Sequence, residues 1–234
     1  MKRTLIIFIL LLGCVEINAG CDSQVLSTLI YKQDSSASII EKCKTYLNSY
    51  LTDDDALLIF RTGRVDILYE LDKMDIPIDL IFSQHTNSLF FDAVIAPINS
   101  IKLLVYLKGK EFLIQDVVAQ NDNTLLYTAL ETGKIDVISY VNNELKGLID
   151  YYEPTHLFAV VRSENLTLIK DFLEKGIDPN IEDSDGITPL MVAAELGNND
   201  LFKLLLEHGA DCYKKNIYGD SACSILESNK PEKN

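Results

Sequence analysis

Several kinds of catalytic motif are missing from this sequence, and their absence argues against the common enzyme classes. There is no glycine-rich phosphate-binding loop, no G-x-S-x-G nucleophile motif and no H-E-x-x-H zinc motif. The three histidines, His85, His156 and His208, are far apart, and none has a cysteine or serine partner within a motif. We therefore predict that the protein is not an enzyme and that these histidines lie at the surface or in the packed interior.

Metal-binding patterns are also lacking. The sequence has no C-x-x-C pair and no cysteine–histidine spacing of the kind that binds zinc. The acidic stretch from Glu182 to Gly186 lacks two carboxylates that a calcium loop needs, because Ile181 and Val192 stand at those positions. We predict no metal and no cofactor.

Positive charge is scarce. The chain has 21 lysines and arginines against 35 acidic residues, which gives a net charge of −14. Such a surface repels phosphate backbones and anionic lipid headgroups, so we expect neither nucleic acid nor direct membrane adhesion. A partner protein with a basic binding surface fits better, although an acidic surface also serves solubility alone.

Long apolar runs are missing as well, and the amino terminus predicts export. The apolar run Leu5–Gly13 follows two basic residues and is too short to span a bilayer, which is typical of a secretory signal peptide covering 1–13. The run ends in Leu-Leu-Gly-Cys, which resembles a bacterial lipobox. By this resemblance Cys14 becomes the lipidated first residue of the mature chain and 14–22 serves as a tether.

Two alternatives to lipidation at Cys14 stay open. One is ordinary cleavage near Ala19 or Gly20, and the other is lipidation at Cys21. The residue after the first cysteine, Val15, is not the aspartate that would retain such a lipoprotein in the inner membrane. The same resemblance therefore favours the outer membrane.

The remaining cysteines are even in number. With Cys14 as an anchor, four of the five cysteines are left in a compartment that permits disulfides. The local pairs would join Cys21 with Cys43 and Cys212 with Cys223. The sequence does not fix this connectivity, and buried free thiols are the alternative.

The clearest secondary-structure signal is a pair of short helices. Thr188 can cap the first, with a proline at the first helical position, and Gly197 can end it in a left-handed conformation. Asn199 or Asp200 can cap the second, and Gly209 can close it. Because helices this short are marginal alone, neighbouring pairs must cover them.

This pattern repeats along the chain. Thr155 and Thr188 are 33 residues apart, as are Gly176 and Gly209. A set of positions in the last full copy resembles the ankyrin repeat; these are Gly186, Thr188-Pro189-Leu190, Ala193-Ala194, Gly197, Leu204-Leu205 and Gly209-Ala210-Asp211. One departure is Met191, which stands where the family motif has histidine.

The resemblance implies an all-α fold, an ankyrin-repeat solenoid of about five helix-turn-helix repeats with irregular terminal caps. After the signal and tether, the predicted segments are an N-terminal helical cap over 23–52, degenerate repeats over 53–149, two well-matched repeats over 150–215, and a C-terminal cap and tail over 216–234.

The resemblance also implies where a partner would bind. Ankyrin repeats contact partners chiefly through the opening turn of a repeat and the end of its first helix. The matching positions here are Tyr151, Tyr152, Arg162, Glu182, Ser184, Asp185, Ile187, Glu195, Leu196, Ile217 and Tyr218. We expect the large side chains among them to face water, where aromatic groups and arginine are the usual anchors. The alternative is that they lie against their own hairpin neighbours.

The predicted function is therefore a non-enzymatic, protein-binding lipoprotein on the periplasmic side of a bacterial envelope. Most specifically, the chain resembles ankyrin-repeat immunity lipoproteins that neutralise lipase-type effectors of type VI secretion. One alternative is a periplasmic accessory factor that supports a resident enzyme such as catalase. Another is an effector that binds host proteins, against which the lipobox argues, because an anchored product does not diffuse to a host.

Overall fold

A computed structural model describes residues 21–112, 124–144 and 150–229. These residues form fourteen α-helices and no β-strand, with one isolated antiparallel bridge between Lys215 and Ser221. The predicted all-α fold is confirmed for this part of the chain. The predicted signal peptide, the Cys14 lipidation site and the end of the tail lie outside the described residues.

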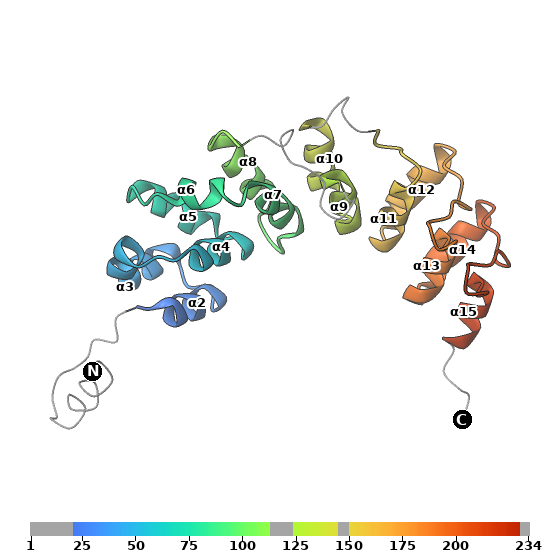
Figure 1. Cartoon of the computed structure of the whole chain (residues 1–234), viewed down its shortest axis with the longest axis horizontal. Helices are drawn as coiled ribbons and strands as arrows, with labels where there is room; N and C mark the ends of the chain where they lie inside the picture. The colour runs from blue at the N-terminus through green and yellow to red at the C-terminus, as the bar shows by residue number, and fades with distance from the viewer. Residues whose placement is uncertain (1–20, 113–123, 145–149, 230–234) are drawn as a thin grey trace, which may run out of the picture. The chain divides into compact units, whose positions relative to one another are not determined.

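The chain divides into two compact units, residues 1–81 and 82–234. Figure 1 shows their helices. The first unit holds α2 (Ser23–Tyr31), α3 (Ser36–Ser49), α4 (Asp53–Arg61) and α5 (Val65–Lys73), and the unit boundary falls within α6 (Ile78–Ser83). The second unit holds α7 (Thr86–Ile95), α8 (Ser100–Gly109), α9 (Leu125–Thr132), α10 (Ile135–Glu144), α11 (His156–Arg162), α12 (Leu166–Glu174), α13 (Pro189–Leu196), α14 (Asn199–Glu207) and α15 (Ala222–Ser228).

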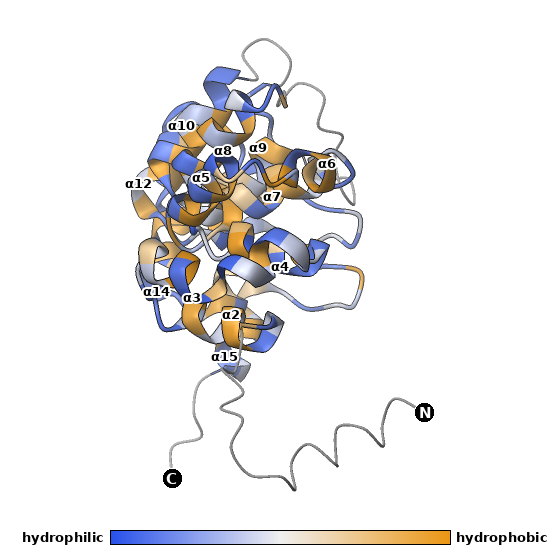
Figure 2. Cartoon of the chain, turned by 90° about the vertical axis from the view of Figure 1, so that its left-hand side faces the viewer, coloured by the Kyte–Doolittle hydropathy of each residue, from blue (hydrophilic) through white to orange (hydrophobic). Residues whose placement is uncertain are grey.

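The helices of the second unit form antiparallel pairs that cover one another. Consecutive helices contact each other in the pairs α7–α8, α9–α10, α11–α12 and α13–α14. The first helices of these pairs also contact in succession and end on α15. Leu126, Leu157 and Leu190, one from each of three first helices, are fully buried. Each short helix therefore obtains from its neighbours the burial that it lacks alone, and Figure 2 shows helices with separate hydrophobic and hydrophilic faces.

Side-chain caps define where the helices begin. The hydroxyl groups of Thr124, Thr188 and Ser221 each accept a hydrogen bond from the backbone N–H three residues later. The second helix of the best-matched repeat is capped by Asn198, whose Oδ1 accepts from the Leu201 N–H at 3.0 Å. The sequence-based choice of Asn199 or Asp200 was wrong by one or two residues, because both already belong to the helix.

A similar polar brace ties two repeats of the second unit to the ones before them. The residue that precedes the second helix of a pair reaches back along the stack. Lys134 Nζ donates to the Ala96 carbonyl at 2.5 Å, and Asn165 Nδ2 donates to the Gly133 carbonyl at 3.1 Å. Burial lowers the pKa of Lys134, against a smaller opposite effect from a nearby aspartate. These braces satisfy carbonyl groups at helix ends that would otherwise lack a partner.

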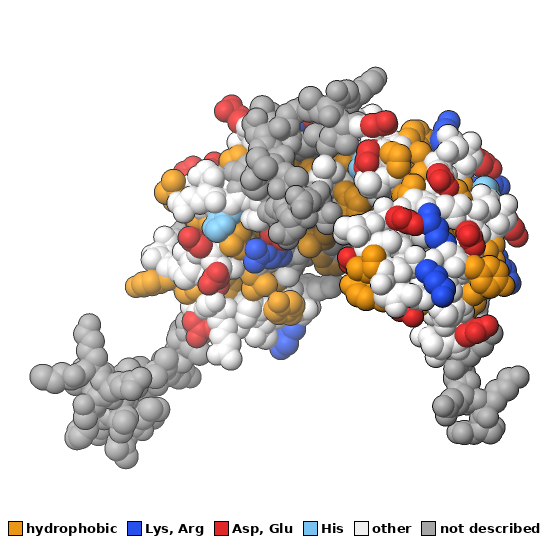
Figure 3. All heavy atoms as spheres, turned by 45° about the vertical axis from the view of Figure 1, so that its right-hand side comes forward, with side chains coloured by type: hydrophobic (Ala, Val, Ile, Leu, Met, Phe, Trp, Pro, Cys, Tyr) orange, Lys and Arg blue, Asp and Glu red, His pale blue; other side chains and the backbone are white. Residues whose placement is uncertain are grey.

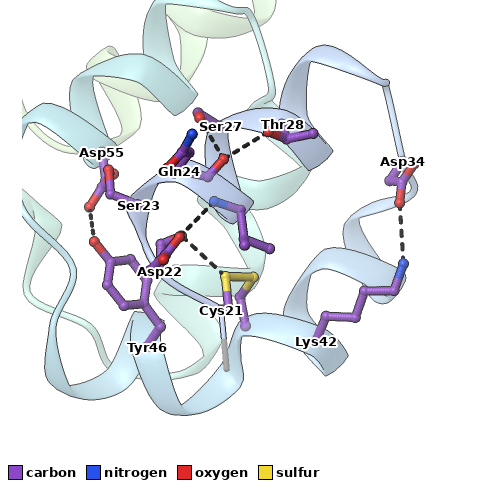
Figure 4. The surroundings of a disulfide bond; sticks show 12 residues. Cys21, Asp22, Ser23, Gln24, Ser27, Thr28, Asp34, Lys42, Tyr46 and Asp55 are labelled. Carbon is purple, nitrogen blue, oxygen red and sulfur yellow. Dashed lines mark hydrogen bonds and ion pairs between the residues drawn. A yellow bond between two sulfur atoms is a disulfide. The ribbon is translucent and has the colours of Figure 1, made fainter. Parts of the chain in front are cut away.

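The first unit is held together by a buried carboxylate. Asp55 Oδ1 accepts from the Ser23 hydroxyl at 2.6 Å, and Asp55 Oδ2 accepts from the Tyr46 hydroxyl at 2.6 Å and the Thr52 hydroxyl at 2.7 Å. Thr52 returns a capping interaction, since its hydroxyl accepts from the Asp55 N–H. One side chain thus joins α2, α3 and the start of α4, and Figure 4 shows Tyr46 pointing at Asp55.

Hydrogen bonding decides the charge state of this carboxylate. Burial raises the pKa of Asp55, but the hydrogen bonds from Ser23, Tyr46 and Thr52 together outweigh it and lower the pKa below its usual value. Asp55 is therefore a charged group in the interior of the first unit, compensated by hydroxyl and amide donors.

Two disulfides close the described ends of the chain. Cys21 is bonded to Cys43, which ties the start of α2 to α3, with their Cα atoms 4.8 Å apart. Cys212 is bonded to Cys223, with their Cα atoms 5.2 Å apart, and this bond spans the loop before α15. Among the described residues, no helix combines the length and the apolar character needed to cross a membrane.

Candidate protein-binding surface

The second unit carries a groove on the side of its first helices. The groove has a volume of about 550 Å³ and lies between α9, α11 and the turn that precedes α13. Its lining residues are Tyr127, Glu131, Thr155, Phe158, Arg162, Glu182 and Asp183. Three carboxylates therefore stand against one guanidinium, which gives the groove an acidic character.

Arg162 organises the polar part of the groove. Its Nη1 donates to the Tyr127 hydroxyl at 2.6 Å and lies 3.6 Å from Glu131 Oε1. The Arg162 side chain keeps 44% of its surface exposed, so the pair interactions stay accessible to a competing group. An exposed ion pair of this kind contributes little to stability, and it is free to exchange partners with an approaching basic side chain.

Partial burial shapes the electrostatics of this cluster. Burial raises the pKa of Glu131, and the Arg162 charge opposes that effect. Burial likewise raises the pKa of the Tyr127 hydroxyl, with Arg162 again opposing it. A cationic partner group placed here would stabilise the Glu131 carboxylate that the protein itself only partly compensates.

The turn before α13 is held by its own aspartate. Asp183 Oδ1 accepts from the backbone N–H groups of Asp185 and Ile187, both at 2.9 Å. Gly186 has φ +73°, and a Cβ there would lie 3.2 Å from the Asn216 Cα. Glycine is needed at this position both for the left-handed backbone and for the close approach of the next turn.

The next turn, before α15, repeats this geometry with an asparagine. Asn216 Oδ1 accepts from the N–H groups of Tyr218 at 3.0 Å and Asp220 at 2.9 Å. The two turns are linked directly, because the Ile217 N–H donates to the Asp185 carbonyl at 3.0 Å. Lys214 adds a second link through an ion pair with Glu182 at 2.9 Å.

Most residues that the sequence analysis assigned to partner binding lie on this side. Arg162 and Glu182 line the groove itself. The other exposed members stand on the two turns or at the end of α13; these are Ser184, Asp185, Glu195, Leu196, Ile217 and Tyr218. Ile187 is half-buried. Figure 3 shows one face of the molecule, on which acidic, basic and hydrophobic side chains are interspersed.

We expected Tyr151 and Tyr152 to face water, but both are half-buried. Their ring centroids lie 5.4 and 5.1 Å from that of Phe172. The Tyr152 hydroxyl donates to Asp171 Oδ2 at 2.8 Å. Burial, followed by this hydrogen bond, raises the pKa of Tyr152 to about 12. The two rings pack against each other and against Phe172 of α12, whereas the alternative given in the sequence analysis was packing against their own hairpin neighbours.

The groove also contains residues that the sequence analysis missed. Glu131 stands seven residues after the capping Thr124, as Arg162 does after Thr155. Tyr127 and Phe158 likewise occupy one equivalent position, three residues after those threonines. Aligning the weak repeat on its capping threonine would have found Glu131, which matches Arg162, but not Tyr127, because the matching Phe158 was not selected either. The poor match of this repeat to the family pattern hid Glu131.

The described residues include no group of three or more histidine, cysteine or acidic side chains placed to hold a metal ion. In the acidic stretch near Gly186, Asp183 instead uses its carboxylate on backbone N–H groups of its own turn. What the surface offers is charge, hydrogen-bonding groups and exposed apolar side chains.

Comparison with known proteins identifies the family of these repeats. Residues 141–216 match the family described as ankyrin repeats, in three copies. The chain is 33% identical over 132 residues to potassium channel AKT2/3 of Arabidopsis thaliana, covering 53% of this chain and 16% of that protein. It is 27% identical over 179 residues to FPV244 of fowlpox virus, whose name describes an ankyrin repeat protein, covering 73% of this chain and 26% of that protein.

A further similarity is to a human protein. Over 91 residues the chain is 29% identical to transient receptor potential cation channel subfamily A member 1, covering 37% of this chain and 8% of that protein. The chain thus spans about a quarter or less of the length of these three relatives. Ankyrin repeats are in general protein-interaction scaffolds rather than enzymes. The chain has an all-α fold that contains ankyrin repeats, and these repeats imply a role in binding another protein.

Proposed function

We propose that this protein is a non-enzymatic inhibitor of the bacterial envelope that binds a toxic protein through the groove described above. The observation that carries the proposal is the groove itself, in which Glu131, Glu182 and Asp183 outnumber Arg162 and the Lys214 that pairs with Glu182. A surface of this charge steers a basic partner and rejects an acidic one. The net charge of −14 acts in the same direction.

The disulfides support an exported protein. Disulfides form and persist in oxidising compartments and are rare where thiols are kept reduced. The structure joins Cys21 to Cys43 and Cys212 to Cys223. The fifth cysteine, Cys14, lies in the lipobox-like sequence at the end of the apolar amino terminus. We therefore propose lipidation at Cys14 and location on the periplasmic side, with the outer membrane favoured.

The specific proposal is an immunity protein against a lipase-type effector of type VI secretion. Such an effector acts on lipids, so an inhibitor tethered to the membrane meets it where it would do damage. Tethering raises the local concentration of the inhibitor at that surface without any new contact. An enzyme-supporting factor would also bind a protein, but it would have no role in competition between cells.

The test starts from the genes beside the one that encodes this chain. We expect the product of a flanking gene to form a one-to-one complex with the purified chain, measured by calorimetry and by light scattering. We also expect cells that lack the chain to be killed by sibling cells delivering that product. Peroxide sensitivity without any loss in competition would contradict the immunity role and favour an accessory factor.

Charge reversal tests the groove. We expect Glu131→Lys to slow association with the flanking-gene product about tenfold at low salt, with the difference shrinking at high salt. Glu174→Lys is the matched control, because Glu174 is an exposed acid on α12 and does not line the groove. Equal effects of the two substitutions would mean that the net charge, rather than the groove, steers binding.

A further inference from the structure

The last helix of the second unit, α15, contributes little apolar surface to the interior. Among its seven residues only Ala222 is fully buried, while Ile225 and Leu226 are half-buried. The preceding helix, α14, by contrast has Leu201 and Leu205 fully buried. A helix of seven residues is marginal by itself and depends on its neighbours. Burial therefore holds α15 less firmly than it holds α14.

Although it is weakly buried, α15 covers part of α13. The two helices contact each other, and Asn229 at the end of α15 donates from Nδ2 to the Ala194 carbonyl at 3.1 Å. With α15 in place, Leu190, Ala193 and Ala194 of α13 have no exposed surface. Removal of α15 would expose apolar surface of α13 to water, which is unfavourable in proportion to the area exposed.

A disulfide stands where a second helix covers each earlier pair. The first helices α7, α9, α11 and α13 each contact a second helix of their own, but among the described residues none follows α15. Instead, Cys212 is bonded to Cys223, the second residue of α15. The Cys223 N–H also donates to the Cys212 carbonyl at 3.1 Å. Such a crosslink stabilises the attached helix mainly by restricting the detached state.

The turn enclosed by this disulfide has contacts of its own. Asn216 Oδ1 accepts from the N–H groups of Tyr218 and Asp220, and the Ile217 N–H donates to the Asp185 carbonyl at 3.0 Å. None of these hydrogen bonds involves α15. The turn is therefore held without the disulfide, and the segment that depends on it is 222–229.

The disulfide of the first unit does not have this role. Cys21 and Cys43 join the start of α2 to α3. However, α2 has Leu26 fully buried, and the Ser23 hydroxyl donates to Asp55 at 2.6 Å. Packing and hydrogen bonding therefore hold α2 in place even when the bond is absent.

From these observations we infer that the Cys212–Cys223 bond is a redox-sensitive switch, which holds α15 on α13 when oxidised and releases α15 when reduced. Disulfides persist in oxidising compartments and are lost in reducing ones. The end of the second unit is then covered only after the chain reaches an oxidising compartment. The inference goes beyond the proposed function and requires no partner protein.

The switch operates by thiol–disulfide exchange with a dithiol. Cys223 is half-buried and Cys212 is buried, so a thiolate of the dithiol attacks Cys223 Sγ and displaces the Cys212 thiolate. The second thiol of the dithiol then breaks the mixed disulfide. The reagent leaves as a disulfide after giving two electrons, and its two protons end on the two cysteine thiols. A disulfide oxidant reverses these steps.

Hydrogen exchange of the full, unlipidated chain tests the switch. In the oxidised chain we expect peptides of 222–229 to exchange at least tenfold more slowly than unstructured chain. With Cys212→Ser and Cys223→Ser together, we expect them to exchange within threefold of unstructured chain. The matched control is Cys21→Ser with Cys43→Ser, in which peptides of α2 should stay at least tenfold slower.

Three outcomes of this experiment would overturn the inference. The first is slow exchange of 222–229 without the Cys212–Cys223 bond. The second is an equal loss of slow exchange in α2 when its own disulfide is removed. The third is a loss in peptides of α14 as well, because the bond would then be needed by the whole unit rather than by α15.

A packing variant keeps the disulfide and tests the competing explanation. We expect Leu226→Ser, in the oxidised chain, to leave 222–229 at least tenfold slower than unstructured chain, because the bond still retains α15. Exchange at the rate of unstructured chain would show that packing of the half-buried Leu226 holds the helix. That result would overturn the inference even if the cysteine variants failed to fold.

Reversibility is measured in the variant that lacks Cys21 and Cys43, where the Cys212–Cys223 bond is the remaining disulfide of the described residues. We expect dithiothreitol to increase binding of the dye anilinonaphthalene sulfonate at least twofold, because α13 is uncovered. Reoxidation by glutathione disulfide should restore the initial value. No increase, or an increase that is not reversed, would overturn the switch and leave the proposed function standing.

Discussion

The same position in a repeat carries opposite chemistry in the two units. Three residues after the capping Thr52, the first unit has Asp55, a buried carboxylate that accepts from three hydroxyl groups. Three residues after the capping Thr188, the second unit has Met191, which is fully buried. Both helices start with the same hydroxyl cap. The backbone pattern is thus independent of whether the interior at this position is polar or apolar.

This difference has an energetic consequence. A polar interior of the kind in the first unit is stable only while every donor and acceptor is paired, because an unpaired buried polar group is costly. An apolar position such as Met191 depends on shape and volume instead. We therefore expect the first unit to be the more sensitive to loss of a single polar atom.

The largest expected effect is that of Asp55→Ala. The substitution leaves the hydroxyls of Ser23, Tyr46 and Thr52 without their acceptor, and we expect the free energy of unfolding of the first unit to fall by about 3 kcal/mol. Urea unfolding followed by circular dichroism measures the total, and hydrogen exchange of peptides from 21–81 assigns it to the first unit. Asp54→Ala, an exposed change in the same helical turn, should cost less than about 1 kcal/mol.

Acid should remove the same stabilisation. The pKa of Asp55 is lower in the folded chain than its usual value, so its contribution is fully present above the unfolded pKa of about 3.9 and is lost as the pH falls through the folded pKa. The stability difference between the unsubstituted chain and Asp55→Asn should therefore shrink below about pH 4. A difference that stays constant down to pH 2 would show that the carboxylate is not the titrating group.

The next largest loss of stability is expected at two turn glycines of the second unit. Gly186 and Gly197 both have positive φ, +73° and +68°, but only at Gly186 would a Cβ meet another backbone atom, the Asn216 Cα at 3.2 Å. We expect Gly186→Ala to cost about 2 kcal/mol through strain and contact, and Gly197→Ala about 1 kcal/mol through strain alone. Thermal unfolding of the two variants measures which loses more stability. Equal losses would mean that the neighbouring turn moves away from the added Cβ at no cost.

A smaller loss of stability is expected when one of two adjacent asparagines, but not the other, is replaced. Asn198 caps α14 through the Leu201 N–H and also donates from Nδ2 to Glu164 Oε2 at 2.8 Å. We expect Asn198→Ala to destabilise the second unit by about 1 kcal/mol. Asn199→Ala should stay within about 0.5 kcal/mol, since Asn199 lies inside the helix and is exposed. Urea titration of both variants measures the two losses of stability. A larger loss for Asn199→Ala would mean that Asn198 is not the residue that caps α14.

The smallest expected effect is a loss of stability at high pH in the second unit, the counterpart of the loss at low pH in the first unit. The pKa of Tyr152 is raised to about 12, above its unfolded value of about 10. The stability that this represents is fully present below pH 10 and is lost as the pH rises towards 12. Because the side chain is partly exposed, we expect a small difference from Tyr152→Phe. Unfolding at pH 9 and at pH 11.5 measures it, and a Tyr152→Phe variant with unchanged alkaline sensitivity would count against this assignment.

The sequence predicted the repeats well where caps and glycines fall at regular spacing. Thr188 and Gly197 act where the pattern placed them, because a hydroxyl cap and a left-handed glycine are local features that require no knowledge of the neighbours. It predicted less well where the outcome depends on packing. Tyr151 and Tyr152 were expected to face water, but Phe172, some twenty residues later, covers them.

The residues of the candidate binding surface were also predicted only in part. Arg162 was identified from the repeat pattern, while its partner Glu131 was not, because its repeat matches the family weakly. Its other partner, Tyr127, stands at a position that the pattern selected in no repeat. The pattern selected Ile217 and Tyr218 but passed over Tyr213, which is not at a position where ankyrin partners usually bind. Only the structure shows that Tyr213 has 79% of its surface exposed.

What the sequence alone determined is the all-α class, the helix caps and the period of the second unit, because these follow from short-range backbone preferences and regular apolar spacing. Only the tertiary structure decided that Asp55 is a buried hub and that Arg162 bridges two repeats. Each of these depends on atoms from segments distant in sequence, and the energy of such contacts is set by how completely the neighbours exclude water and supply hydrogen bonds.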